Sequence, residues 1–408
     1  MISDELIDKV VERLANRVEQ ANTYILKEIG RSIQEIGTIN PTKANQLVQM
    51  LKYGDSYDKL VKEIARITKL NVKDIEDIFE EVAKHDYNFS KNFFDYRGKE
   101  FIPYNRNRAI ISEVKALANI TKQEYINLTR TSALGFGMLD KDGNVVFKSL
   151  KDTYYDLLDD AVLSVSQGKE TFNSAMYREL KQIGESGLKV IYPTTYIDKD
   201  GIERHYTRRL DSAVRMNMKS ALRNLHNEIQ QQLGDEFDAD GVEISVHENP
   251  AEDHQYAQGK QFTKKEYNKL QTTGVAKSYD KKLIDMHKGA HFRPISEWNC
   301  YHYIFSIVLG VNKPQYSDEA LNEIIDRNNK GFEYEGQHYT MYQGTQLQRQ
   351  IETAIRTLKD VQTTAQAGGI QDLVQDTRGK IKTLNRKYKE LCNISGLRAK
   401  MDRLRIGG

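Results

Sequence analysis

The stretch VEISVHENPAEDHQYAQGKQF (residues 242–262) and the stretch RPISEWNCYHYIFSIVLGV (residues 293–311) carry most of the chemically distinctive side chains of this chain. Residues 242–311 together hold five of the nine histidines, one of the two cysteines and the only tryptophan. Alternating apolar and polar residues over 242–246 predict a half-buried strand that ends at His247. A polar loop leaving this strand places the histidines at the edge of a small β-containing unit.

The histidines and the cysteine of this stretch admit a zinc site. His287, His291, Cys300 and His302 are residue types that form tetrahedral zinc shells. Gly289 and the nearby proline disfavour a shared helix face for the first two, and the Cys-x-His spacing is tighter than that of the usual loop ligands. We therefore expect hydrogen-bonded histidines and assign no metal and no cofactor, with the metal site kept as an alternative.

A nucleophilic Cys300 with His254 or His302 as its base is a further alternative. No local motif supports it, and Cys300 precedes the apolar run 304–309, where a cysteine is usually a small buried hydrophobe. The sequence also lacks the glycine patterns of phosphate-binding loops. We assign no catalytic residue.

The sequence at the N-terminal end predicts helices. Apolar residues at helical spacing predict a long amphipathic helix over 1–36. Pro41 then predicts the start of a short helix to residue 51, and further short helices are expected after Gly54 and from Asn71, which reads as an N-cap. The N-terminal third is thus expected to consist of short helices and turns after the first long helix.

The middle of the chain contains an aromatic segment, two predicted hairpins and a predicted helix. Residues 89–104 mix aromatic and basic side chains, which favours a hydrophobic seam over a nucleobase-stacking surface. Asp-Gly pairs between extended runs predict hairpins at 139–147 and 196–206. An apolar stripe at spacings of three and four predicts a helix over 209–233.

Two further helices are expected at the C-terminal end, over 344–366 and, more basic, over 371–392. From Thr340 onward the chain has thirteen Lys and Arg against six Asp and Glu, although its total charge is only +2. The tail is therefore the part suited to an acidic partner or to DNA. We name the following residues as DNA-binding candidates: Arg378, Lys380, Lys382, Arg386 and Lys387.

Length and composition limit the domain organisation, the disulfide content and the fold class. A chain of 408 residues is expected to form several domains, and we place them at 1–110, 111–235, 236–340 and 341–408. Two cysteines give no disulfide framework. We expect no signal peptide and no membrane-spanning helix. The predicted fold is α+β and predominantly α-helical, with long amphipathic helices around a small β-containing unit.

Several ordered motifs resemble one known family. They are a strand ending in Ser-x-His, the pattern His-x-x-x-Gln-Gly-Lys, the element Asn-Cys-x-His before an apolar strand and Gly, and Arg-x-x-Glu-x-x-Ile-Arg on a Gln-rich helix. The family is that of the second class of tailed-bacteriophage minor capsid proteins, related to the Mu F-like head-morphogenesis proteins. The matching residues are Ser245, His247, His254, Gln258, Gly259, Lys260, Asn299, Cys300, His302, Gly310, Gln348, Arg349, Glu352, Ile355 and Arg356.

This resemblance implies a structural virion protein in the capsid interior near the portal, acting in head assembly, DNA packaging or delivery. It implies portal and capsid subunits as partners, together with packaged double-stranded DNA, and neither a membrane nor a small-molecule substrate. The host cytoplasm is the expected site of assembly. The alternative is a metal-dependent hydrolase or nuclease built on the His/Cys cluster of 247–302, and a nucleic-acid-binding protein outside any virion is a third reading.

Overall fold

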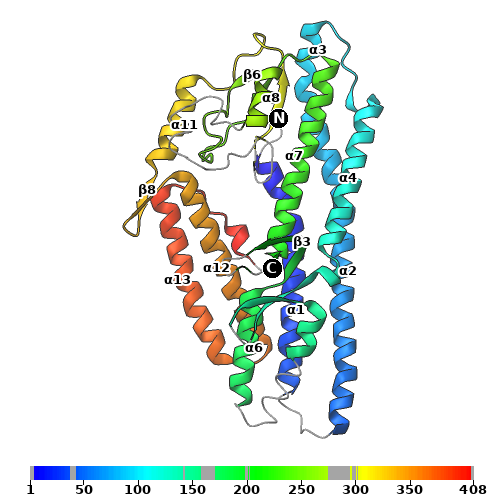
Figure 1. The fold of residues 1–408 in the computed structure, drawn as a ribbon, viewed down its shortest axis with the longest axis vertical. Helices are drawn as coiled ribbons and strands as arrows, with labels where there is room; N and C mark the ends of the chain where they lie inside the picture. Colours follow the sequence, from blue (N-terminus) through cyan, green and yellow to red (C-terminus); the bar gives the residue numbers. More distant parts are fainter. Residues whose placement is uncertain are drawn as a thin grey trace.

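The computed structural model describes residues 4–36, 43–140, 143–157, 171–197, 201, 203–273, 295, 300 and 302–405. Four long helices run side by side along the long axis of the molecule (Figure 1). They are α1 (Asp4–Ile36), α2 (Lys43–Tyr87), α4 (Arg108–Leu128) and α7 (Leu210–Glu236). Small strand regions lie against this bundle, so the predicted, predominantly helical α+β fold is confirmed.

Apolar stripes hold the bundle together. The stripe predicted over 209–233 is buried along its whole length and forms the inner face of α7, because its spacing matches the helical repeat. One continuous core cluster extends from Ile7 to Val374. The buried stripe of α7 consists of Leu210, Val214, Met218, Leu222, Leu225, Ile229 and Leu233.

The expectation of short helices between residues 43 and 87 is wrong, since α2 is one continuous helix of 45 residues. Gly54 lies within it, and Asn71 is buried inside it instead of capping a new helix. The Asn71 amide donates to the Leu14 carbonyl at 3.2 Å and to the Tyr125 hydroxyl at 2.6 Å. These tertiary bonds satisfy a side chain that would otherwise compete with the helix backbone.

The aromatic segment after α2 belongs to the core, as predicted. Helix α3 (Lys91–Arg97) buries Phe93 and Phe94. Both rings pack on Phe237 at the end of α7, with ring centroids 5.0 and 5.5 Å apart respectively. Because these faces are covered, they offer no surface for stacking nucleobases. Short 3₁₀ turns at Asn88–Ser90 and Tyr104–Arg106 flank this segment.

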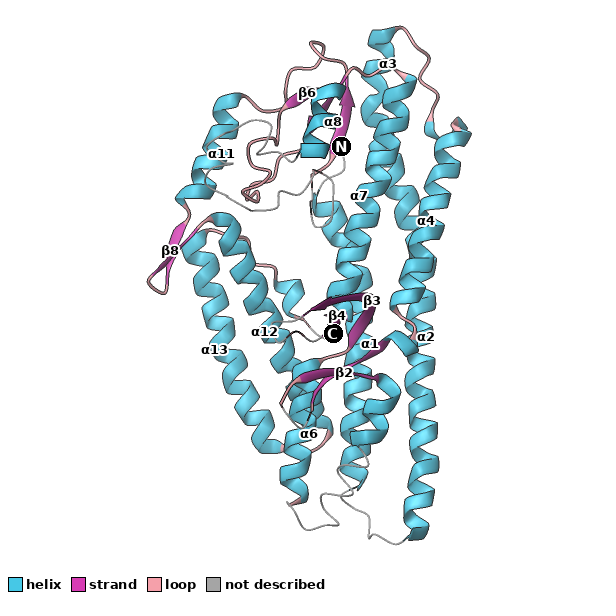
Figure 2. Ribbon diagram, viewed as in Figure 1, coloured by secondary structure: helices cyan, strands magenta, loops and turns pink. Residues whose placement is uncertain are grey.

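A four-stranded antiparallel sheet crosses the middle of the bundle (Figure 2). Its order is β2-β1-β3-β4, and both predicted hairpins form the pairs β1–β2 and β3–β4. A short 3₁₀ turn, Thr131–Ala133, leads into it. The four strands are β1 (Leu134–Leu139), β2 (Val145–Ser149), β3 (Lys189–Ile197) and β4 (Glu203–Arg209).

A second sheet carries the central sequence stretch. Its order is β6-β5-β7, all antiparallel, with β5 (Gly241–Ile244) in the centre between β6 (Gln261–Thr263) and β7 (Ile304–Ile307). The predicted strand at 242–246 is therefore confirmed in its position. With α8 (Lys264–Thr273), these strands enclose a small core of their own.

The C-terminal helices form a hairpin beside the bundle (Figure 1), and both were predicted. They are α12 (Met341–Ala367) and α13 (Gln371–Ser395). Among the described residues, no helix combines the length and the apolar character needed to cross a bilayer. The remaining elements are α6 (Phe172–Ser186), α11 (Asp318–Lys330), the hairpin β8 (Phe332–Tyr334) and β9 (Gln337–Tyr339), the turn Met401–Leu404, and a helical segment at 150–157.

Candidate functional site

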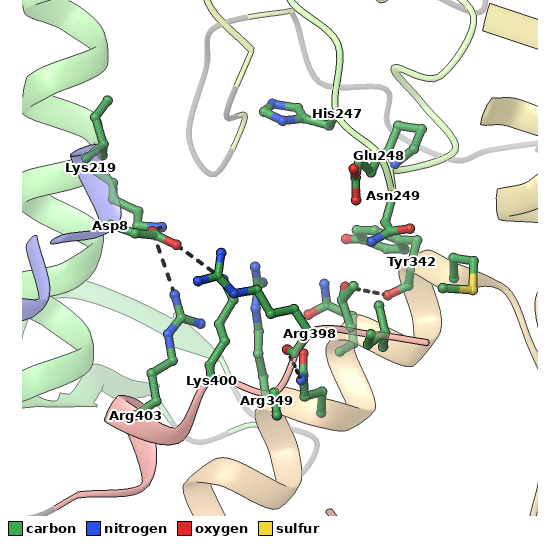
Figure 3. A pocket seen from close by; sticks show the side chains of 18 of the residues that line it. Asp8, Lys219, His247, Glu248, Asn249, Tyr342, Arg349, Arg398, Lys400 and Arg403 are labelled. Atoms are coloured by element: carbon green, nitrogen blue, oxygen red, sulfur yellow. Dashed lines mark hydrogen bonds and ion pairs between the residues drawn. The ribbon is translucent and has the colours of Figure 1, made fainter. Parts of the chain in front are cut away.

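A cavity of about 1570 Å³ lies where α1, α7, α12 and the end of the chain meet the loop after β5. Figure 3 shows Asp8 and Lys219 on one side of it, His247, Glu248 and Asn249 on another, and Arg398, Lys400 and Arg403 along its floor. Eight Lys and Arg line the cavity against four Asp and Glu, so its walls are positively charged. The basic residues are Lys9, Arg13, Lys219, Arg327, Arg349, Arg398, Lys400 and Arg403.

Asp8 is the anionic centre of one wall. Its carboxylate faces Lys219, lies 3.3 Å from Lys400 Nζ and lies 3.9 Å from an Arg403 guanidinium nitrogen. Partial burial alone would raise the pKa of this carboxyl, but the three cations lower it to about 2. Asp8 therefore stays ionised and ties α1 to α7 and to the end of the chain.

A His/Cys cluster, consisting of His254, Cys300 and His302, forms another wall of the cavity. All three side chains are buried, with exposed fractions of 2%, 2% and 3%. Cys300 Sγ lies 3.4 Å from His254 Nδ1 and 3.4 Å from His302 Nδ1. One sulfur and two imidazole nitrogens thus face a common point.

Helix α7 and strand β5 position the segment that carries Cys300 and His302. The Arg223 guanidinium donates to the Cys300 carbonyl, and a ring nitrogen of His226 contacts the Ile304 carbonyl at 3.0 Å. Ser245 accepts from the Tyr303 backbone N–H at 2.9 Å through its hydroxyl. These bonds hold the segment in which Cys300 Sγ and His302 Nδ1 lie 3.4 Å apart.

Oxygen acceptors face the outer ring nitrogens of both histidines. His254 Nε2 lies 3.7 Å from the Asp253 carboxylate, and His302 Nε2 lies 3.4 Å from Gln258 Oε1. The same Gln258 oxygen accepts from the His247 backbone N–H at 2.8 Å. The structure therefore brings the sequence-predicted His247, His254, Gln258, Cys300 and His302 into one site.

The tight Cys-x-His spacing is no obstacle to a shared ligand, because Cys300 Sγ lies only 3.4 Å from His302 Nδ1. The other proposed zinc ligands, His287 and His291, and the motif residue Asn299 lie outside the described residues. A search of the described residues for His, Cys, Asp and Glu side chains close enough to share a metal ion finds His254, Cys300 and His302.

Comparison with known protein families identifies the family of this chain. The model of the family described as phage minor capsid protein 2 matches residues 2–393. This chain belongs to that family. No curated protein and no solved structure matches it significantly. The chain is therefore a structural protein of the phage virion, and the resemblance drawn from the sequence motifs is confirmed.

The two motif glycines of this minor capsid protein differ in their surroundings. Gly259 has φ +70°, and a Cβ placed on it would lie 2.4 Å from Leu321 Cδ2. Its N–H donates to the Ile244 carbonyl at 2.8 Å, and the Lys260 carbonyl accepts from the Ile244 N–H at 3.2 Å, which closes the loop that carries His254. Gly310 has φ +76° and open space around it.

The Gln-rich helix of the family pattern, α12, secures the end of the chain. Gln348 donates to the Arg398 carbonyl at 2.9 Å, and Arg356 donates to the Arg403 carbonyl at 3.1 Å. The buried Glu352 carboxylate accepts from the Tyr388 hydroxyl at 2.9 Å. These motif residues hold the floor of the cavity in place, whereas the exposed Arg349 contributes its charge to the cavity wall.

A buried ion cluster escaped the sequence analysis. The Arg209 guanidinium lies 3.2 Å from the Glu19 carboxylate, 3.3 Å from Asp211 and 2.9 Å from Asp360. All three carboxylates are buried, so α1, α7 and α12 meet at one cation. One signal was present in the sequence, because Glu19 falls within the apolar stripe of the first helix beside Val18.

The DNA-binding candidates all lie on α13, on the surface or partly exposed. Lys380 and Lys387 are paired with Asp376 and Glu335, each at 2.7 Å. Arg378, Lys382 and Arg386, spaced four residues apart, share one helix face, and no carboxylate of the described chain lies within ion-pair distance of them. We call these three residues the basic stripe.

Proposed function

We propose that this minor capsid protein lies in the interior of the phage head near the portal vertex, and that it acts there in head assembly, DNA packaging or delivery. The observation that carries the proposal is the family match over residues 2–393, which includes the bundle, the cavity lining up to α12 and the basic stripe. On this proposal the protein works by binding portal and capsid subunits and not by catalysing a reaction.

The form of the molecule supports a structural role. Buried or partly buried ion pairs and hydrogen bonds join α1, α7, α12 and the end of the chain, which are far apart in the sequence. Breaking one partner of a buried pair leaves an uncompensated charge and is strongly destabilising. Such links suit a body that transmits force between a capsid wall and a packaged genome without opening.

The basic stripe supports contact with packaged DNA. Its three cations lie on one face of α13 over two helical turns, where they can approach successive phosphates of a duplex. Lys380 and Lys387 add less, because each is partly neutralised by its carboxylate. This contact is electrostatic and independent of DNA sequence.

Protease protection tests the interior location. Intact particles and particles emptied of DNA are treated with the same protease, and the protein is followed by mass spectrometry of its peptides. We expect peptides from α13 to be cleaved only after emptying, together with those of other internal proteins. Equal cleavage in intact particles, with the capsid shell undamaged, would place the protein outside the head and refute the proposal.

The His/Cys cluster supports a second candidate function, a metal-dependent hydrolase or nuclease. Three metal-binding side chains lie on the wall of a positively charged cavity, an arrangement that could hold a phosphate group beside a metal-bound water. Incubation of the purified protein with DNA and zinc tests it. Cleavage that chelation and His302→Ala both abolish would establish a nuclease, and intact DNA would exclude that activity.

A further inference from the structure

We propose that His254, Cys300 and His302 bind one zinc ion, which joins the loop after β5 to the segment before β7. The inference goes beyond the proposed structural role in the virion and does not depend on the second candidate function, because zinc can bind here whether or not the protein catalyses a reaction. It rests on the distances within the His/Cys cluster, on the hydrogen bonding around it, and on its position beside the cavity.

The distances fit tetrahedral coordination. With Zn–S of about 2.3 Å and Zn–N of about 2.0–2.1 Å, two ligand atoms of a tetrahedral site are about 3.5 Å apart. Cys300 Sγ lies 3.4 Å from the Nδ1 atom of each histidine. The cluster therefore already has the spacing of two edges of a zinc shell, and all three ligand atoms lie within 4.8 Å of one another.

The hydrogen bonds around His302 fix which ring nitrogen carries the proton. Gln258 Oε1 accepts from the His247 backbone N–H, so this end of the amide is its oxygen. His302 Nε2 lies 3.4 Å from the same oxygen and must be the N–H side of the ring to donate to it. In neutral His302 the lone pair is then on Nδ1, which points at Cys300 Sγ.

His254 repeats this arrangement. Its Nε2 lies on the side of the Asp253 carboxylate, at 3.7 Å, and its Nδ1 faces Cys300 Sγ. Two ring lone pairs and a sulfur thus converge on one buried point, where a single cation could bind all three atoms. An imidazole whose outer nitrogen faces a carboxylate or amide oxygen is also the usual form of a metal-binding histidine.

The types of ligand atom favour zinc over magnesium and calcium. One thiolate and two imidazoles suit zinc, whereas magnesium and calcium prefer oxygen ligands. All three side chains line the cavity, so the fourth position is open to a water molecule or to an anionic group that enters from it. The ion would also neutralise the buried thiolate.

The surrounding core explains what the ion would do. Among the described residues, eight buried hydrophobic side chains, Cys300 among them, form a small cluster in the β6-β5-β7 unit that is distinct from the main core cluster. Small cores often depend on a metal or another cross-link for stability, and binding free energy then becomes folding free energy. Zinc would hold His254 and Cys300, 46 residues apart, in one place.

Metal analysis of the purified full-length chain tests the proposal. After expression with zinc and dialysis against metal-free buffer, we expect about one zinc ion per chain by mass spectrometry of the elements. Cys300→Ser and His302→Ala should each lose at least nine tenths of it. As matched controls, the other buried cysteine, in Cys392→Ser, and the exposed helical His85, in His85→Ala, should change nothing. Absence of zinc in the wild-type chain, or zinc that persists in Cys300→Ser, overturns the proposal.

Cobalt substitution keeps the test independent of how the variants fold. The wild-type chain, freed of metal by a chelator and loaded with Co²⁺, should show a thiolate-to-cobalt charge-transfer band in the near ultraviolet and strong visible bands of a tetrahedral ion. Added zinc should remove both. A weak octahedral spectrum without the charge-transfer band would show that Cys300 is not a ligand, and the proposal would then be wrong.

Discussion

Replacing Glu19 with glutamine should remove much of the pH dependence of folding stability. Glu19 is 2% exposed and faces Arg209, which it shares with Asp211 and Asp360. Burial, the largest cause, and the charges of Asp211 and Asp360 raise the pKa of the Glu19 carboxyl, Arg209 opposes them, and the net result is a pKa of about 8. In the unfolded chain the group has its ordinary pKa, near 4.5.

The sign of the effect follows from proton binding. Between pH 5 and pH 8 the folded chain holds a proton on Glu19 that the unfolded chain has lost, so the free energy of unfolding falls as pH rises. One such proton changes it by about 1.4 kcal/mol per pH unit. From pH 5.5 to pH 7.5 the loss is therefore about 3 kcal/mol. The pKa of Asp360 is also raised, chiefly by burial, and acts in the same direction.

Denaturant unfolding followed by circular dichroism, at several pH values from about 5 to 8, measures this difference. Glutamine cannot ionise, so Glu19→Gln should reduce the slope of the free energy of unfolding against pH by the equivalent of about one proton. The variant should exceed wild type in stability most at the alkaline end of the range. Glu80→Gln, an exposed control on α2, should keep the wild-type slope. Parallel profiles for wild type and Glu19→Gln would refute the account of the ion cluster.

Three further substitutions test other parts of the structure. Gly259→Ala should cost about 3 kcal/mol of stability by thermal or denaturant unfolding, because the residue has a positive φ and its new Cβ would overlap Leu321. Tyr388→Phe should cost about 2 kcal/mol in the same assay, since it removes a hydrogen bond to the buried Glu352 carboxylate. Changing all three residues of the basic stripe to glutamine should weaken DNA binding at low salt and reduce the slope of log K against log salt by about 2.7 in titrations.

Each of these three has a control. Gly310→Ala, at a positive φ with open space, should cost only about 1 kcal/mol, and an equal loss at both glycines would contradict the overlap. Tyr96→Phe at an exposed site should leave stability unchanged. Glutamine at Lys380 and Lys387, which are paired with carboxylates, should affect DNA binding less than changes in the stripe. The reverse order would move the DNA contact elsewhere.

Local patterns predicted the elements that packing also favours. The stripe of α7 and the two hairpins follow from periodicity and Asp-Gly turns. The long α2 did not, because Gly54 and Asn71 are local signals for a break. Asn71 is satisfied by Leu14 and Tyr125, which are distant in the sequence, and only the fold reveals that.

The sequence predicted the candidate site only in part, because its residues also meet through contacts between distant parts of the chain. The sequence singled out His254, Cys300 and His302 as chemically distinctive. The Cys-x-His spacing counted against a shared metal ion, because the usual loop ligands of zinc are further apart in the sequence. In the structure Cys300 Sγ nevertheless lies 3.4 Å from His302 Nδ1, and His254 joins them from the loop closed at Gly259. Arg209 gave no signal, since its partners come from three separate helices.

Asymmetric cryo-electron microscopy of the intact particle, with the portal vertex reconstructed without imposed symmetry, tests the proposed location most directly. We predict density for the elongated helical body inside the head, in contact with portal or neighbouring capsid subunits, with α13 facing the packaged DNA. Density that fits the molecule on the outer surface of the capsid, or at vertices that lack a portal, would contradict the proposal.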